Sequence, residues 1–245
     1  MRIRVINPNT TASMTATIGA AARAAASSGV AIDAVNPAHG PVSIEGHYDE
    51  AVAAVGLLQE VRRGETEGVD GYVIACFGDP GLDAAREIAR GPVVGIAEAA
   101  FRFATYVATG FSVVTTLGRT VVIAEHLLHR YGVERHCRKV RACEVAVLEL
   151  EDPRCDAYAR ILAECRAALA EDRSGAIVLG CAGMADLCHR LAVELQVPVI
   201  DGVAAAVATV EALVRTGVST SKRGDYALPR PKPYAGMFNG MQPTP

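Results

Sequence analysis

Two cysteines stand at equivalent points of two similar stretches of the sequence. Cys76 follows the apolar run 73–75, and Cys181 follows the run 177–179 after one glycine. A continuous apolar run is typical of a buried parallel strand. Open parallel sheets bind their ligands at the carboxyl ends of the strands. We therefore expect the two thiols, one from each half of the chain, to face each other across one pocket.

Two thiols on opposite sides of one carbon atom could interconvert its stereoisomers. One thiolate would remove a proton, and the opposite thiol would deliver a proton to the other face. A free cysteine has a pKa of about 8.5, which helix N-termini or cations lower, so we expect one thiolate and one thiol near neutral pH. Backbone N–H groups at Phe77, Gly78, Ala182 and Gly183 would stabilise the charge on a neighbouring carbonyl oxygen.

The alternative is that both cysteines are ordinary core residues, because free cysteine is among the most buried residue types. Their recurrence at matched strand ends favours the catalytic interpretation. No pair of the seven cysteines has C-x-x-C spacing and their number is odd, so we expect neither structural zinc nor a disulfide framework. Five cysteines lack a matched partner, and we expect them to be structural: Cys137, Cys143, Cys155, Cys165 and Cys188.

The order of the predicted elements indicates an α/β fold that is duplicated within the chain. Helical patterns separate strands predicted at 2–6, 30–35, 71–75, 92–96, 111–116, 138–145, 176–180 and 198–201. This alternation implies parallel sheets with right-handed crossovers. A helix is expected directly after each cysteine turn, and Asp79 before Pro80 suits the N-cap of the first one. The simplest architecture is two pseudo-symmetric domains, each a short parallel sheet flanked by helices, with the active site in the cleft between them.

We divide the chain into two lobes and an arm. The first lobe spans residues 1–98 and the second spans 99–203. A helix at 204–218 is expected to cross back to the first lobe, because the chain ends of a domain usually lie close together. Prolines exclude regular helix from the extended arm at 219–245, which should cover the body or a neighbouring subunit.

The composition favours a globular protein that acts on a small molecule. Hydrophobic residues make up 51% and charged residues 21% of the 245 residues, which is ample for a core. The net charge of −3 gives no reason to expect nucleic acid or an anionic membrane as a partner. No apolar run approaches the roughly 20 residues of a membrane span. The N-terminal residues lack a signal peptide pattern, so we expect a cytoplasmic protein.

The sequence resembles the hydantoin and allantoin racemases of the aspartate/glutamate racemase superfamily. The resemblance covers essentially the whole chain and is carried by residues 7–10, 43–47, 75–81, 95–100, 113–116, 179–184 and 220–222. It implies two α/β domains with the site between them, a mechanism that uses two cysteines, no cofactor, and a homo-oligomer. Cys76 and Cys181 match the catalytic pair.

The choice of substrate depends on the group at C5 of the hydantoin ring. Residues 41–47 and 113–117 look closer to allantoin racemase, and the ureido group of allantoin would need hydrogen-bond partners such as Ser43, Glu45 or Thr115. The low aromatic content of 5% and the absence of tryptophan also favour this polar substituent. The sequence departs from the allantoin-type pattern near 101–103, Gly110 and Gly118, so hydantoins with an alkyl or aryl group remain the alternative.

The predicted binding residues follow strand ends. Asn9 should contact the ligand or cap a helix. Glu45 should orient the ligand or its loop, or be a solvated acid. One of Thr115 and Thr116 should contact the ligand, because they follow the first strand of the second half. The full predicted set contains no metal ligand: Asn9, Ser43, Ile44, Glu45, Phe77, Gly78, Thr115, Thr116, Ala182 and Gly183.

Three other functions compete with this interpretation. Amino-acid racemases of the superfamily carry Asn-Thr after the first cysteine and Thr-Glu or Thr-His after the second, where this chain has Phe77-Gly78 and Ala182-Gly183. A dicarboxylate isomerase or decarboxylase would need cationic groups, and no arginine stands at the cysteine turns. A solute-binding protein would also have two lobes, and binding without turnover that is insensitive to thiol alkylation would favour it.

Overall fold

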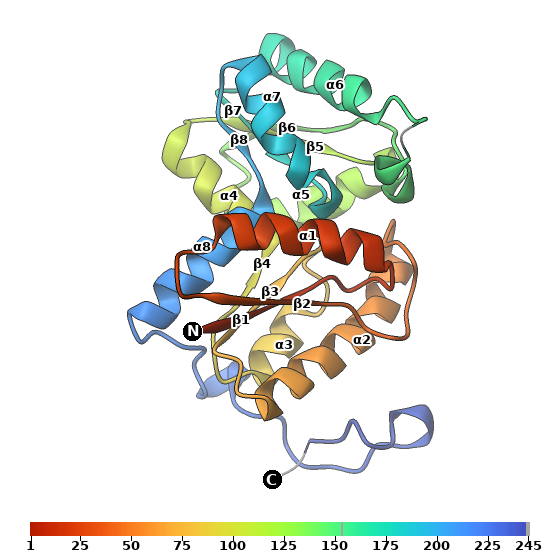
Figure 1. The fold of residues 1–245 in the computed structure, drawn as a ribbon, viewed down its shortest axis with the longest axis vertical. Helices are drawn as coiled ribbons and strands as arrows, with labels where there is room; N and C mark the ends of the chain where they lie inside the picture. The colour runs from red at the N-terminus through yellow and green to blue at the C-terminus, as the bar shows by residue number, and fades with distance from the viewer. Residues whose placement is uncertain (153, 244–245) are drawn as a thin grey trace.

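Two α/β lobes are stacked on each other in the computed structural model, which describes residues 1–152 and 154–243 (Figure 1). The first sheet has the strand order β2-β1-β3-β4 and is entirely parallel. Helix α1 lies on one face of this sheet, and α2 and α3 lie on the other. The elements are β1 (Arg2–Ile6), α1 (Ala12–Ala25), β2 (Ala31–Val35), α2 (His47–Thr66), β3 (Gly71–Ile74), α3 (Leu82–Ile88) and β4 (Val93–Gly95).

The second lobe repeats this topology. Its parallel sheet has the order β6-β5-β7-β8. The two central strands are β5 and β7, which correspond to β1 and β3 of the first sheet. The elements are α4 (Ile96–Val107), β5 (Phe111–Thr115), α5 (Val121–Arg130), β6 (Cys137–Ala142), α6 (Ala157–Glu171), β7 (Ala176–Leu179), α7 (Cys188–Leu195) and β8 (Val199–Ile200). The matching strand orders confirm the predicted fold class of two pseudo-symmetric α/β domains.

Apolar packing joins the two lobes. The ring of Phe77, after β3, meets the ring of Phe101 on α4 edge-on at 5.4 Å between centroids. Phe101 in turn stacks on Phe111 at the start of β5, with the centroids 5.9 Å apart. All three side chains are buried. Aromatic pairs in these geometries add to the stabilisation that burial provides, so the core is continuous across the lobe boundary.

Helix α8 (Gly202–Arg215) follows the last strand and packs against α4, α1 and β3. Asp201 caps it, since its carboxylate accepts hydrogen bonds from the N–H groups of Val203 and Ala204 at 2.9 and 3.1 Å. The limits of the two lobes remain a prediction. No helix in the described part of the chain has the length and apolar character that crossing a membrane requires.

The C-terminal arm runs along the first lobe and contains two short 3-10 helices, Gly224–Tyr226 and Gly236–Phe238. The Lys222 ammonium donates to the carbonyl oxygens of Arg86 and Glu87 at the end of α3, at 2.6 and 3.1 Å. Arg62 on α2 donates to the Gly240 carbonyl at 3.0 Å. The described part of the arm therefore lies over its own body, while the prediction for residues 244–245 falls outside the described residues.

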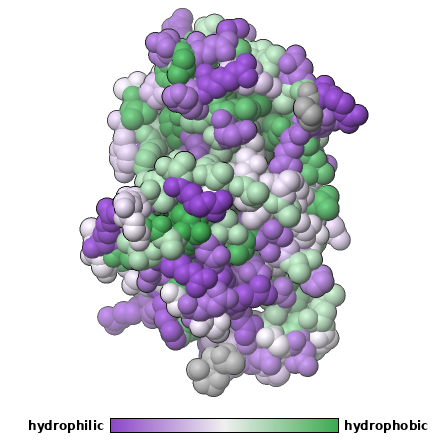
Figure 2. Space-filling view, viewed as in Figure 1, coloured by the Kyte–Doolittle hydropathy of each residue, from purple (hydrophilic) through white to green (hydrophobic). Residues whose placement is uncertain are grey.

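One face of the molecule shows apolar side chains along its middle as well as in parts of the second lobe (Figure 2). Green side chains gather where α1 and α8 cross the middle of the view, and purple side chains cover much of the rest (Figure 2). The alanine-rich sequences of these two helices explain this, because their outward positions carry Ala16, Ala20, Ala24 and Ala208.

Candidate active site

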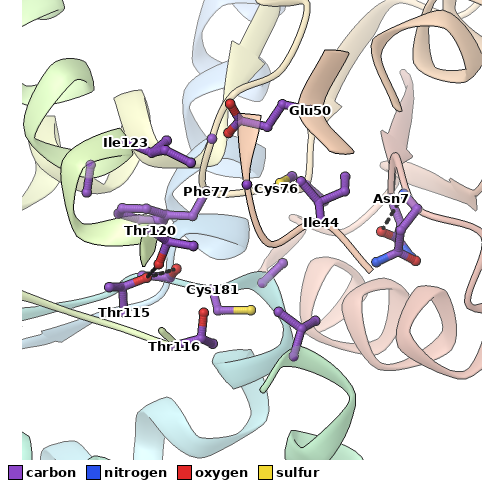
Figure 3. Close-up of a pocket in the computed structure, with 18 of the residues that line it drawn as sticks. Asn7, Ile44, Glu50, Cys76, Phe77, Thr115, Thr116, Thr120, Ile123 and Cys181 are labelled. Atoms are coloured by element: carbon purple, nitrogen blue, oxygen red, sulfur yellow. Dashed lines mark hydrogen bonds between the residues drawn. The ribbon is translucent and has the colours of Figure 1, made fainter. Parts of the chain in front are cut away.

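A pocket between the lobes contains both predicted catalytic cysteines. Cys76 follows β3, and Cys181 follows β7 after Gly180. Both side chains are partly exposed and line the same pocket, one from each lobe (Figure 3). Seven of the predicted binding residues line it with them: Asn9, Ile44, Phe77, Gly78, Thr115, Thr116 and Ala182.

Three predicted binding residues, Ser43, Glu45 and Gly183, do not line this pocket. The Glu45 carboxylate instead accepts a hydrogen bond from the backbone N–H of Val147 in the second lobe at 3.1 Å. Its own N–H donates to Asp49 at 3.0 Å. Glu45 therefore orients its loop, which was one of its predicted roles, and ties that loop across the lobe boundary.

The pocket wall also holds residues that the sequence did not single out: Asn7, Met14, Gly46, Glu50, Ala75, Thr120, Ile123, Ala124, Val147 and Gly180. Glu50 is the one carboxylate among the described lining residues, and it lies in the first turn of α2. The only hint in the sequence was that α2 starts directly after the predicted binding loop.

Asn9 lines the pocket and also holds the turn before α1. Its side-chain carbonyl accepts hydrogen bonds from the Thr11 N–H at 2.9 Å and from the Asn7 amide at 2.8 Å, which secures the start of α1. Its amide nitrogen faces only the sulfur of Met14, at 3.2 Å. Thioether sulfur is a weak acceptor, so this amide is a donor that remains available to a ligand in the pocket.

The two threonines at the end of β5 differ in their hydrogen bonds. The Thr115 hydroxyl pairs with the Thr120 hydroxyl at 3.0 Å and donates to the Gly180 carbonyl at 3.3 Å. The Thr116 side chain lies beside Cys181, and its hydroxyl has no hydrogen bond to another described residue (Figure 3). Thr116 is therefore the better oriented of the two for contact with a ligand.

The prediction that the pKa values of the two thiols are lowered is wrong. Burial raises the pKa of Cys181 to about 11, and the nearby N–H of Gly183 offsets only part of this shift. Burial raises the pKa of Cys76 even further, and the charges of Glu50, Cys181 and Asp79 add to the increase. The predicted α-helix N-termini are not adjacent to the sulfurs. A 3-10 helix at Ala182–Leu187 separates Cys181 from α7, and α3 begins only at Leu82.

Asp79 does not cap its own helix as predicted. Gly81, with a positive φ of 67°, is the N-cap of α3. The buried Asp79 carboxylate instead accepts hydrogen bonds from the N–H groups of Ala97 and Glu98, at 3.1 and 3.0 Å, and from the Tyr131 hydroxyl at 2.7 Å. It thus caps α4 and connects the Cys76 turn to the second lobe. Burial raises its pKa to about 6 despite these bonds.

The remaining ionisable groups of the described chain do not form a metal site, because none of its clusters contains three or more suitably arranged His, Cys, Asp or Glu side chains. All seven cysteines are free thiols. The fold and the pocket thus define a two-lobed α/β protein with a thiol from each lobe at one site.

Comparison with known proteins identifies the family. The family model described as Asp/Glu/Hydantoin racemase matches residues 3–210, so the chain belongs to this family and the predicted resemblance is confirmed. A hydantoin racemase of Rhizobium meliloti is 53% identical over 236 residues, which cover 96% of this chain and 98% of the relative. The structure of an allantoin racemase from Klebsiella pneumoniae is 58% identical, covers 100% of both chains and has a TM-score of 0.98. That of allantoin racemase from Pseudomonas fluorescens is 43% identical, covers 96% of this chain and 100% of its own, and has a TM-score of 0.93.

Proposed function

We propose that this protein is a cofactor-independent racemase that inverts C5 of hydantoin-type rings, with allantoin as its substrate. The observation that carries the proposal is the pair Cys76 and Cys181, which come from different lobes and line one pocket. The family and the names of its relatives support the same type of reaction.

In the proposed reaction the ring lies between the two sulfur atoms. One cysteine thiolate removes the proton from C5 and becomes a thiol, and the electron pair left on carbon delocalises onto the adjacent carbonyl oxygen. The other thiol then donates its proton to the opposite face of C5 and becomes a thiolate. The two cysteines exchange roles for the opposite enantiomer, and atoms and charge balance in both directions.

The enolate oxygen needs hydrogen-bond donors that are fixed before the reaction starts. We assign this role to the backbone N–H groups of Phe77 and Ala182, the residues next to the two cysteines, both of which line the pocket. Preorganised donors at such a position typically lower the barrier by about 3 kcal/mol.

Allantoin is favoured by the polar groups of the wall. The Asn9 amide and the Thr116 hydroxyl are available donors or acceptors, and a ureido substituent can use both. Two highly similar structures are allantoin racemases. A second candidate is a hydantoin with an apolar C5 group, supported by Ile44 and Ile123 in the same wall and by the hydantoin racemase relatives. Dicarboxylates are disfavoured, since no arginine or lysine lines the described part of the pocket.

Circular dichroism of a single enantiomer tests the proposal. The signal of (S)- or (R)-allantoin should decay to zero in the presence of the protein, and faster than that of benzylhydantoin or isopropylhydantoin. Cys76→Ser and Cys181→Ser should each abolish racemisation, while each keeps proton–deuterium exchange with one enantiomer. Full racemisation by both single variants would disprove the two-thiol mechanism, and a faster reaction of the substituted hydantoins would favour the second candidate.

A homo-oligomer remains part of the proposal. The apolar centre formed by α1 and α8 in Figure 2 and the exposed Leu228 and Met237 of the arm offer surfaces that a second subunit could cover. Sedimentation of the full chain measures its size directly.

A further inference from the structure

We propose that Glu50 accepts the proton of the Cys76 thiol and passes it to solvent, so that Glu50 acts on the substrate through Cys76. This inference rests on the proposed racemisation and assigns it a third proton-handling group. Glu50 does not belong to the two-thiol pair, and its position in the pocket wall is independent of the sequence resemblance.

The carboxylate of Glu50 is directed at the turn that carries Cys76. Its Oε1 atom occupies the place that a side chain at Gly78 would fill, since a Cβ atom added there would overlap Oε1 and lie 2.8 Å from Cδ. Glu50 and Cys76 both belong to the first-lobe side of the pocket (Figure 3). The negative charge of Glu50 contributes to the raised pKa of Cys76, as expected for groups in close proximity.

Within the described chain, the Glu50 carboxylate lacks the hydrogen bonds that hold other shielded carboxylates of this protein in place. Other shielded carboxylates are fixed by several donors, as Asp79 is by three and Asp201 by two. The Glu50 carboxylate accepts no hydrogen bond from another described residue, and the Nδ1 atom of His47 lies 3.7 Å from its Oε2 atom. Partial burial of a carboxylate that receives no hydrogen bond from the protein disfavours its charged form, and a functional role is a common reason for such a group.

The proton has a route from the pocket to solvent. Cys76 S–H and the Glu50 carboxylate would become the Cys76 thiolate and the protonated Glu50, with no change in total charge. The Glu50 side chain is 19% exposed and borders the 67% exposed His47 at the start of α2. Glu50 can therefore release the proton to water after turnover, while Cys181, now a thiolate, regains one.

Burial, followed by the charge of Asp49, raises the pKa of Glu50 to about 7. Glu50 is thus able both to accept and to release a proton near neutral pH. The titratable and charged groups around it are His47 and Asp49 on α2, Cys76 on the facing turn, and Arg119 of the second lobe, which lies over Gly46 at the start of α2.

The test compares Glu50→Gln with the control Glu125→Gln, which makes the same change on the exposed side of α5. Glu50→Gln should lower kcat for allantoin about 100-fold, and the acidic limb near pH 7 in the kcat/KM profile should disappear. Glu50→Asp should restore part of the rate and the limb. Glu125→Gln should leave both unchanged. A Glu50→Gln variant with the wild-type rate and the same limb would overturn the inference.

Labelling of the thiols by iodoacetamide separates failure of this inference from failure of the proposed function, because it needs no substrate. Peptide mass spectrometry should show an inflection near pH 7 in the labelling rate of Cys76, which Glu50→Gln removes, and unchanged labelling of Cys181. If the wild-type protein racemises neither allantoin nor other hydantoins, the proposed function fails. If the labelling profile of Cys76 does not change in Glu50→Gln, the role of Glu50 fails, whatever the substrate is.

Discussion

Asp79→Asn should change how the stability of the protein depends on pH. The Asp79 carboxyl is 2% exposed, and its pKa is raised from 3.8 to about 6 in the folded state. A raised carboxyl pKa means that its contribution to stability is fully present below the unfolded pKa and is lost as the pH rises through the folded pKa. A shift of about 2 units corresponds to about 3 kcal/mol over the whole titration.

About 2 kcal/mol of this loss should fall between about pH 4.5 and about pH 7, because the unfolded chain is already partly ionised at the lower pH. Asparagine cannot ionise, has nearly the same shape and tolerates the positive φ of 44° at this position. The free energy of unfolding of Asp79→Asn, relative to wild type, should therefore rise by about 2 kcal/mol from the lower pH to the higher pH.

Urea unfolding followed by far-UV circular dichroism at both pH values measures this difference. The other titrating groups cancel when the two proteins are compared at each pH. Asp225→Asn is the matched control, since Asp225 is exposed on the arm and the same substitution there should leave the difference independent of pH. A constant difference for Asp79→Asn would refute the reasoning, because it would mean that the three donors fully offset the burial of the carboxylate.

Three further predictions concern close contacts. Gly78→Ala should push the Glu50 carboxylate out of the pocket wall, so it should reduce racemisation with little change in melting temperature; full activity would contradict the assigned contact. Gly95→Ala should overlap the Asp79 carboxylate and lower the urea-unfolding free energy by about 1–3 kcal/mol; wild-type stability would contradict this. Lys222→Met should free the arm from α3 and accelerate its cleavage by chymotrypsin; unchanged cleavage would show that other contacts hold the arm.

The strands and the meeting of the two cysteines could be predicted because local sequence determines them. The runs before Cys76 and Cys181 are continuous and apolar, which is typical of a strand buried on both faces. Their similar spacing from the proline-started strands at Pro92 and Pro198 indicated a duplication. The same strand order in both sheets follows from this repeat, and the cleft then lies where the carboxyl ends of the central strands face each other.

Asp79 shows what local sequence does not determine. Its sequence context, Asp-Pro, is typical of a cap for the helix that follows, but the start of α4 lies within reach of the same carboxylate. The absence of a side chain at Gly95 leaves room for that contact. The choice between the two helices is made by tertiary packing, and neither partner is adjacent to Asp79 in the sequence.

Glu50 was missed for a related reason. It stands in a turn of α2 with three other polar or charged residues, His47, Tyr48 and Asp49, and such a turn usually faces water. The side of this turn that meets the pocket depends on how α2 is placed against β3 and the Gly78 turn. Glu45 depends on tertiary packing in the same way, because its carboxylate orients its loop by accepting a hydrogen bond from Val147 of the second lobe, far away in the sequence.

The raised thiol pKa values give Glu50 its significance. An increase from 9.0 to about 11, as for Cys181, makes the thiolate a stronger base but reduces its population at neutral pH about 100-fold. The stronger base reacts faster, but this gain in rate is smaller than the loss caused by the lower thiolate population. Burial alone would therefore slow the reaction. Cys76, with the higher pKa, has the greater need for a nearby proton acceptor, and Glu50 lies on its side of the pocket. The asymmetry between the two thiols therefore predicts that Glu50→Gln affects labelling of Cys76 and spares Cys181.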